Sequence, residues 1–350
     1  AGAQCAVPSL VAVLQGRSAN ASRAAAGLLH LIGPPAVPDL SSALLDGEDT
    51  LKQIYVIRVL ARLGPRAAGA MDGLGRALGS EFLHVRIAAA QAMAKIAPPP
   101  ESAIPRLVAG LSERSADARE SMALCLACAG PAAEPAVPHL LLLLVDRNEQ
   151  VRQAAEAALT QIGPKAVPAL IALLETRDAQ RLGALMDTVS RVSQWWAPPK
   201  IEYAAIGPRD VWKNLSWAAH DIMEERLRLE GAQQAALRVL GQLGSTASPA
   251  VPAVTAASSD RNPKIQLAAI RTLGQIGPEA QRATPALIQM LLHDHELFRV
   301  EAARTLGQIG AGAQPAIPAL TAALQDGYPP VQEEAAKALA KIEEQEVDTK

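Results

Sequence analysis

Apolar residues recur along the chain at the spacing of one face of an α-helix. The pattern is clearest over 150–162, where the apolar positions are Val151, Ala154, Ala155, Ala158, Leu159 and Ile162. A shorter apolar segment, 137–145, precedes it and carries a proline in its first turn, where a missing N–H costs nothing. Polar residues 146–149 separate the two segments, and Gly163-Pro164 ends the second. The pattern predicts two helices joined by a short turn.

The same pair of predicted helices repeats along the chain. A Gly-Pro pair or a related pair ends the second helix at Gly33, Gly64, Ala97, Gly130, Gly163, Gly277 and Gly310, mostly at intervals of 33 residues. A single pair cannot bury its apolar faces, whereas stacked pairs can. The sequence therefore predicts an all-α fold, an α-α superhelical solenoid of about ten helical hairpins that fills residues 1–350 as one domain.

The most regular repeats resemble a known family. Val151-Arg152-Gln153-Ala154-Ala155 leads to Gly163-Pro164, and Arg299-Val300-Glu301-Ala302-Ala303 leads to Gly310. These residues resemble HEAT repeats of the short bacterial type, the phycobilin-lyase-like HEAT family, and the resemblance covers nearly the whole chain. It implies an armadillo-like solenoid and a role in protein–protein docking, and it carries no catalytic residues.

The regular spacing fails between Pro164 and Ser245, which encloses about 15 residues more than two repeats need. We expect a Trp-rich insertion at 194–208, between repeats six and seven. The aromatic residues of this region are Trp195, Trp196, Tyr203, Trp212 and Trp217, and they include every Trp in the chain.

This aromatic region has two interpretations. Trp and Tyr offer large, rigid contact areas, so the region is a candidate recognition site for a partner protein. Arg191 is expected to project beside it from an extra helical turn. In the alternative interpretation the Trp side chains pack the insertion onto neighbouring helices.

A row of arginines occupies equivalent positions in the second helices, at Arg86, Arg119, Arg152 and Arg299. The turns between helices carry acids at one equivalent position, at Asp146, Asp260 and Asp326, with Glu113 in another repeat. The row is either a surface for an acidic partner or a structural ladder inside the solenoid. We favour the structural ladder, in which each Arg pairs with a turn acid.

Composition and charge narrow the possible partners. The formal net charge is −2 and no part of the chain is strongly basic, so we expect no nucleic-acid partner. The longest apolar run, 140–145, is too short to span a membrane. Three cysteines give no disulfide framework, and nothing resembles a signal peptide. The Arg-rich composition, with the Ala and Pro content, points to a GC-rich genome, and we expect a soluble protein of the bacterial cytoplasm.

Candidate catalytic or metal sites are weak. Cys125 and Cys128 form a Cys-x-x-Cys on a predicted second helix, where Cys125 takes a core position. His293-Asp294-His295-Glu296 is the one histidine cluster, and its single His-Glu pair departs from the related HEAT-like di-iron hydroxylases. We predict no metal, no cofactor and no enzymatic activity.

The sequence thus predicts a scaffold that binds another protein, in a larger complex or alone, through a concave face lined by the second helices and through the Trp-rich insertion. One alternative is a lyase-like subunit that holds an apolar or tetrapyrrole ligand, with Asp210 or His220 nearby. Another is a HEAT-like DNA glycosylase with Asp187, which the near-neutral charge disfavours. The first hairpin has no polar cap, and we expect its residues Val7, Leu10, Val11, Val13 and Leu14 to face a preceding segment or a partner.

Overall fold

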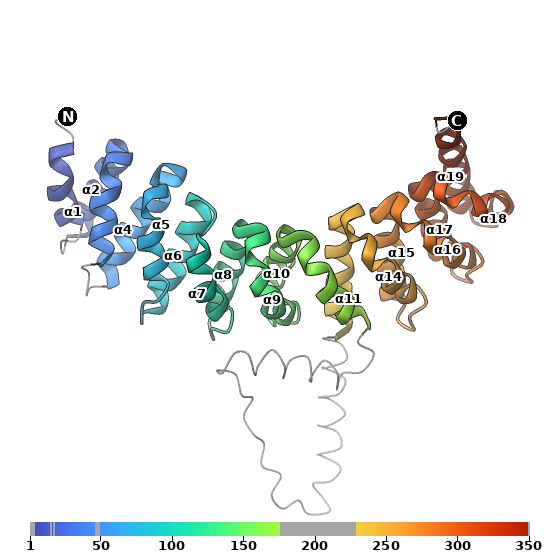
Figure 1. Ribbon diagram of the computed structural model, residues 1–350, viewed down its shortest axis with the longest axis horizontal. Coiled ribbons are helices and arrows are strands. Elements are labelled where there is room, and N and C mark those ends of the chain that lie inside the picture. The colour runs from blue at the N-terminus through green and yellow to red at the C-terminus, as the bar shows by residue number, and fades with distance from the viewer. Residues whose placement is uncertain (1–3, 15, 17, 46–49, 176–228, 349–350) are drawn as a thin grey trace, which may run out of the picture. The chain divides into compact units, whose positions relative to one another are not determined.

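The computed structural model describes residues 4–14, 16, 18–45, 50–175 and 229–348. Within these residues the chain is helical and contains no strand. The α-helices of the described residues pair into nine hairpins, and Figure 1 shows these hairpins following one another in chain order within each of two units. The all-α solenoid that the sequence predicts is confirmed.

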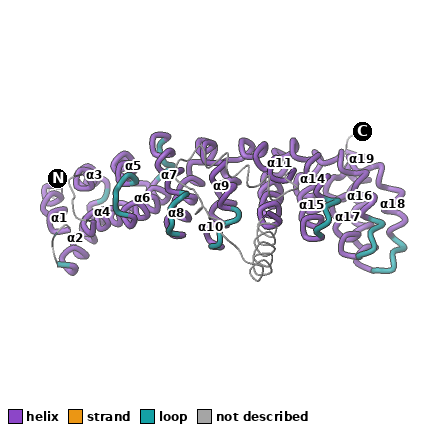
Figure 2. Tube along the Cα trace, turned by 90° about the horizontal axis from the view of Figure 1, so that it is seen from below, coloured by secondary structure: helices purple, strands orange, loops and turns teal. Residues whose placement is uncertain are grey.

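The first unit extends to Ile162 and holds five hairpins. Their helices are α1 (Val7–Leu14) with α2 (Ala19–Ile32), α3 (Val37–Leu45) with α4 (Thr50–Leu63), α5 (Met71–Ala77) with α6 (Leu83–Ile96), α7 (Ile104–Gly110) with α8 (Ala116–Ala129), and α9 (Val137–Leu143) with α10 (Glu149–Ile162). Figure 2 shows the odd-numbered helices of this unit in one row and the even-numbered helices in a second row.

The second unit begins at Gly163 and holds four hairpins among its described residues. Their helices are α11 (Val167–Glu175) with the helix at 229–243, α14 (Val251–Ala257) with α15 (Pro263–Ile276), α16 (Thr284–Met290) with α17 (Glu296–Ile309), and α18 (Ile317–Ala323) with α19 (Pro329–Asp348).

Short 3-10 helices lead into the first helix of each hairpin. They are η1 (Gln4–Ala6), η2 (Pro34–Ala36), η3 (Gly64–Ala70), η4 (Glu101–Ala103), η5 (Gly130–Ala136), η6 (Gly163–Ala166), η7 (Gly244–Ala250), η8 (Gly277–Ala283) and η9 (Gly310–Ala316). Gly277 shows how a second helix ends, because its φ of 78° places it in the left-handed region and its N–H closes the helix onto Leu273 O. The following Pro278 then starts the 3-10 helix.

The core is aliphatic and lies between the two rows of helices. In α8, for example, Ala118, Met122, Cys125 and Leu126 are buried. Successive second helices pack directly on one another within each unit. Small residues at the contacts let these helices approach closely: a Cβ atom added to Gly307 of α17 would lie 2.9 Å from Ala338 Cα of α19.

The sixth hairpin differs from the others in the length of chain between its helices. Gln233 of the helix at 229–243 donates to Leu173 O and Leu174 O of α11, at 3.5 and 3.4 Å. Helix α11 also contacts α14, the first helix of the next hairpin. Residues 176–228 therefore connect the two helices of one hairpin. The expected insertion at 194–208 and the tenth expected hairpin fall in this segment, outside the described residues.

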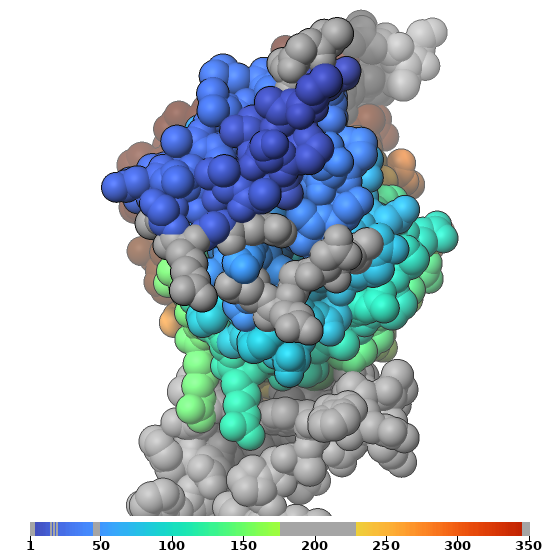
Figure 3. Space-filling view, turned by 90° about the vertical axis from the view of Figure 1, so that its left-hand side faces the viewer, coloured from blue at the N-terminus to red at the C-terminus, as the bar shows by residue number. Residues whose placement is uncertain are grey.

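The first hairpin corrects one expectation from the sequence. Val7, Val11 and Leu14 do not face outward, because they are buried in the core that α1 shares with α2, α3 and α4. Val13 is 43% exposed, and Leu28 and Leu31 of α2 are also exposed. Figure 3 looks onto this end of the first unit, where the first hairpin, in the darkest blue, faces the viewer.

The close approach of α17 and α19 predicts opposite effects for two Gly→Ala substitutions. In Gly307→Ala the new methyl group meets the backbone of α19, so we expect a loss of about 1–3 kcal/mol of unfolding free energy. In Gly241→Ala the methyl group meets only the end of the flexible Gln275 side chain, so the gain of helix propensity, up to about 1 kcal/mol, should prevail. Urea unfolding of both variants checks this, and equal effects would contradict it.

Candidate functional site

The aromatic residues predicted to bind a partner lie outside the described residues. Trp195, Trp196, Tyr203, Trp212 and Trp217 all fall within 176–228, as does Arg191. Their role as a recognition site therefore stays a prediction. The described helices carry two rows of charged and polar side chains that join successive hairpins.

The first polar row joins neighbouring turns. Arg119 donates from Nε and Nη2 to the carboxylate of Asp146, at 2.7 and 3.0 Å, and Arg299 donates to Asp326 at 2.8 and 2.9 Å. Arg86 donates from Nη2 to the carboxylate of Glu113. In each pair the acid follows the arginine by 27 residues, which places it in the next turn.

The same guanidinium groups also bind the turn of their own hairpin. Nη1 of Arg119 donates to the carbonyl oxygens of Glu113 and Arg114, and Nη1 of Arg299 donates to those of His293 and Asp294. Each arginine therefore joins two successive turns through both its charge and its fork of N–H groups. With its donors used inside the solenoid, this row holds hairpins in register.

The row has two incomplete positions among the described residues. Arg152 donates to Asp146 O and Arg147 O, and the residue 27 positions further along lies outside the described residues. Asp260 accepts the N–H of Asn262 at 2.7 Å, and the residue 27 positions before it is Gln233, not an arginine.

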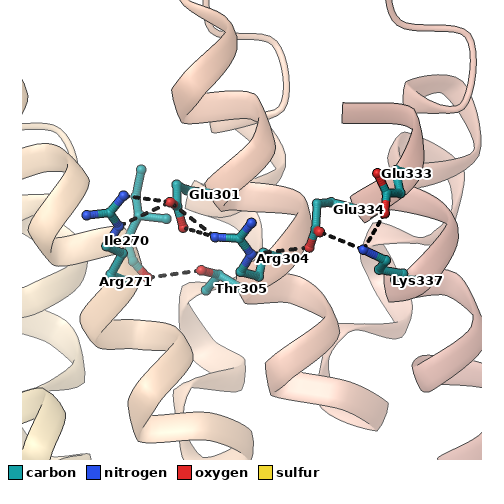
Figure 4. Close-up of polar contacts among 8 residues, drawn as sticks. All are labelled: Ile270, Arg271, Glu301, Arg304, Thr305, Glu333, Glu334 and Lys337. Atoms are coloured by element: carbon teal, nitrogen blue, oxygen red, sulfur yellow. Dashed lines mark hydrogen bonds and ion pairs between the residues drawn. The ribbon is translucent and has the colours of Figure 1, made fainter. Parts of the chain in front are cut away.

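The second polar row, which sequence reasoning missed, lies on the exposed face of the second helices in the second unit (Figure 4). Arg271 of α15 donates to Glu301 of α17 at 2.7 Å, and Arg304 of α17 donates to Glu334 of α19 at 3.2 Å. Arg304 also contacts Glu301 at 3.3 Å, and Lys337 pairs with Glu334 at 3.1 Å. The carboxylates and cations thus alternate across three helices.

A sequence signal for this second row exists. Its cations lie at intervals of 33 residues, at Arg238, Arg271, Arg304 and Lys337. The three arginines each precede a Leu-Gly-Gln segment, whose glutamines Gln242, Gln275 and Gln308 are exposed. Arg271 and Arg304 remain 56% and 45% exposed, while the side chain of Glu301 is 9% exposed between them.

Buried polar contacts support the same face from below. Thr305 donates from Oγ1 to Ile270 O at 3.1 Å, and Thr272 donates to Leu237 O at 3.0 Å. These bonds join successive second helices directly beneath the charged row, and Figure 4 shows the first of them. These hydrogen bonds therefore hold in place the helices that carry the exposed charged row.

The cysteine pair has no geometry for redox or metal chemistry. Cys125 is buried, and burial together with the nearby Cys128 raises the pKa of its thiol to about 12. Cys128 is exposed, and its thiol donates to Ala94 O at 3.6 Å.

The histidine cluster has a structural role. His295 caps α17, because its Nδ1 accepts the N–H of Leu297 at 3.2 Å, and its ring lies 3.6 Å from the carboxylate of Glu296. Within the described residues no three His, Cys, Asp or Glu side chains gather closely enough to hold a metal ion.

Two helical runs, Ala116–Leu143 and Glu149–Glu175, are long and apolar enough to cross a membrane by length and composition alone. Each run consists of two α-helices and an intervening 3-10 helix that starts at a glycine with positive φ, Gly130 or Gly163. Core helices pass the same test, so these runs are weak support for membrane insertion.

Comparison with known proteins identifies the family. The model for HEAT repeats matches residues 37–127, 230–299 and 284–349, which together make up more than half of the chain. The chain belongs to the HEAT-repeat family. A comparison with curated proteins found no match.

Several solved structures are similar to this HEAT-repeat chain. A chain from a structure of Kap95p with RanGDP is 13% identical, with a TM-score of 0.54, over 96% of this chain and 44% of that one. The complex of CpcE and CpcF of phycocyanin lyase from Nostoc sp. PCC7120 is 25% identical, with a TM-score of 0.38, over 44% of this chain and 98% of that one. An engineered protein is 22% identical, with a TM-score of 0.37, over 96% and 98% of the two chains. The similarity to the chain from the Kap95p structure supports the assignment of the helical solenoid fold.

The turn ladder predicts a pH-dependent effect for Asp326→Asn. The hydrogen bonds from Arg299 lower the pKa of Asp326 below its ordinary value of 3.8, so the ionised carboxylate stabilises the folded state above that pH. We expect the variant to lose about 1–3 kcal/mol of unfolding free energy at neutral pH. The loss should shrink as the pH falls below 3.8 and through the lowered pKa in the folded protein.

Urea unfolding of wild type and variant at neutral and acid pH measures this difference. Asp260→Asn is the matched control, because Asp260 has the same place in its turn and the residue 27 positions before it is Gln233, not an arginine. An equal loss in both variants, or a loss that does not depend on pH, would contradict the ladder.

The raised pKa of Cys125 predicts selective alkylation. At mildly alkaline pH iodoacetamide should modify the exposed Cys128 in the folded protein and leave the protonated, buried Cys125 intact. Peptide mapping by mass spectrometry reads out each site, with urea-unfolded protein as the control in which both react. Rapid modification of Cys125 in the folded protein would show that its helix opens.

Proposed function

We propose that this HEAT-repeat protein is a non-catalytic scaffold that binds a partner protein through the exposed face of the second helices in its second unit. The Trp-rich segment at 194–208 and the aromatic residues that follow it would add the recognition hot spot. Family membership supports this role, because stacked repeats present extended surfaces for docking.

The observation that carries the proposal is the arrangement of Arg271 and Arg304. Both guanidinium groups are held by the carboxylate of Glu301, yet about half of each side chain is open to solvent. An arginine that is already ordered loses less conformational freedom when it binds a partner's carboxylate or carbonyl oxygen. Arginine is also enriched among the residues that dominate binding energy at protein interfaces.

The position of the Trp-rich segment along the chain supports its part in the proposal. Residues 176–228 lead directly into the helix at 229–243, which carries Arg238, the first cation of the exposed row. Trp195, Trp196, Trp212 and Trp217 precede that helix by 12 to 34 residues of chain. Large aromatic side chains and ordered arginines are residue types that form interface hot spots.

Affinity capture from the native extract, followed by binding measurements with the purified captured protein, tests the proposal. The variants are Arg271→Gln/Arg304→Gln and the fourfold Trp→Ala variant at 195, 196, 212 and 217. Arg282→Gln is the control, because Arg282 is exposed and lies on η8, outside the second helices themselves. Circular dichroism establishes that each variant is folded.

We expect the double Arg variant to stay folded and to bind the partner at least about tenfold more weakly, while Arg282→Gln binds like wild type. A folded Trp variant that loses the partner would support the aromatic hot spot, and an unfolded one would favour the packing interpretation. Unchanged binding in the folded double Arg variant would show that the partner uses another surface.

A further inference from the structure

A groove lies between α4 and α6 on the exposed face of the second helices in the first unit. It has a volume of about 560 Å³ and is open to solvent along one side. Its floor is apolar and includes Ile54, Ile57 and Ile87. Because α4 and α6 pack on each other below this floor, the groove is a fixed feature of two adjacent hairpins.

The rim of this groove is positively charged. Arg58, Arg62 and Lys95 line it together with His84, and no Asp or Glu lies among its lining residues. The structure gives the side chains of Arg58, Arg62 and Lys95 no hydrogen-bond or ion-pair partner within the described chain. All three are exposed. The chain itself is slightly acidic, with a formal net charge of −2, so this cluster is a local exception.

Two helix pairs of the second unit carry a carboxylate at this position, at Glu301 and Glu334. Arg58 stands in α4 where Arg271 stands in α15, six residues before the glycine that ends each helix. The residue 30 positions after Arg271 is Glu301, which binds it. The residue 30 positions after Arg58 is Ala88. The groove therefore lies where a carboxylate of the next helix is missing.

The neighbouring pair in the first unit confirms the register. Gln91 of α6 donates from Nε2 to Ser121 Oγ of α8 at 3.1 Å, and these residues are also 30 positions apart. They are the neutral counterpart of Arg304 and Glu334. The spacing thus brings side chains of successive second helices together in both units, and at Arg58 the acceptor alone is absent.

We propose that the groove between α4 and α6 binds an acidic segment of a partner protein. A carboxylate of that segment takes, beside Arg58, the place that Glu301 takes beside Arg271, and apolar side chains of the segment cover Ile54, Ile57 and Ile87. This inference rests on the proposed function, because it names the chemistry of a partner and a second surface that it contacts.

The chemistry of the groove favours an acidic peptide over a nucleic acid. Nucleic-acid sites combine a long track of cations with aromatic side chains for stacking, whereas this groove has three cations around an aliphatic floor. A peptide that carries Glu and Leu side chains satisfies both parts of the surface, with charge-assisted hydrogen bonds at the rim and apolar burial at the floor.

Fluorescence anisotropy with the purified chain tests the proposal. The probe is a fluorescein-labelled peptide rich in Glu and Leu, and its matched control carries Gln in place of every Glu. Arg58→Gln removes the central cation. Ala88→Glu supplies the missing carboxylate from within the chain, as Glu301 does, and Ala88→Gln adds a side chain of similar size without charge.

We expect the acidic peptide to bind the wild type in a salt-sensitive manner and the Gln peptide to bind at least about tenfold more weakly. Arg58→Gln and Ala88→Glu should each weaken binding about tenfold, whereas Ala88→Gln should weaken it less. Ala88→Glu should also raise the Tm, which shows that the new carboxylate has paired with Arg58 in a folded protein. Equal binding of both peptides, or tight binding by Ala88→Glu, would overturn the proposal.

Two further measurements separate this inference from the proposed function. The Arg271→Gln/Arg304→Gln variant keeps every residue that lines the groove, so the peptide binding that Arg58→Gln and Ala88→Glu remove should persist in it. If that variant loses the captured partner while the peptide still binds the groove, both ideas stand. If the partner is captured normally but no acidic peptide binds, this inference alone fails. Displacement of the peptide by a single-stranded oligonucleotide that binds more tightly would assign the groove to phosphate instead.

Discussion

Within each unit the described second helices pack against one another, and the other features of the structure depend on that contact. The two helices of a single hairpin cover only part of each other's apolar surface. The rest stays exposed to solvent until another hairpin packs against it. Small residues set the distance of the contact, as at Gly307 and Ala338, where one added methyl group would reach the neighbouring backbone. The repeat of about 33 residues is the length of chain that this arrangement needs.

Once the helices are fixed at this distance, polar side chains meet at two constant separations along the chain. A separation of 27 residues joins an arginine to the acid of the next turn, as in Arg119 and Asp146. A separation of 30 residues joins side chains on the exposed face, as in Arg271 and Glu301. The first set uses its donors inside the solenoid, and the second leaves half of each arginine open to solvent.

Side chains that lie 30 residues apart on the exposed face differ between the two units, although the helices pack in the same way. In the second unit it holds a continuous row of paired charges, while in the first unit it holds a neutral hydrogen bond between Gln91 and Ser121 and an arginine opposite Ala88. A single position in the repeat thus holds a carboxylate at Glu301 and an alanine at Ala88, which lines the groove. Repeat proteins can change specificity in this way without a change of fold, because the backbone contacts lie below the exposed positions.

The sequence alone predicted the architecture and the pairs that Arg86, Arg119 and Arg299 make in the turn ladder, whereas Asp260, also expected in the ladder, has Gln233 at the arginine position. The signals used were local or strictly periodic: helical periodicity, the prolines of the first turns and the regularly spaced arginines. Such signals predict where helices form and end. The sequence could not show that α11 pairs with a helix that begins 54 residues after it ends, because equal spacing was the only guide and the spacing fails there. It also misplaced Val7, Val11 and Leu14, since which face of a terminal helix is covered depends on neighbours in space. The charged row and the groove required the tertiary structure for the same reason: each is formed by side chains of successive hairpins that meet only when the helices stack.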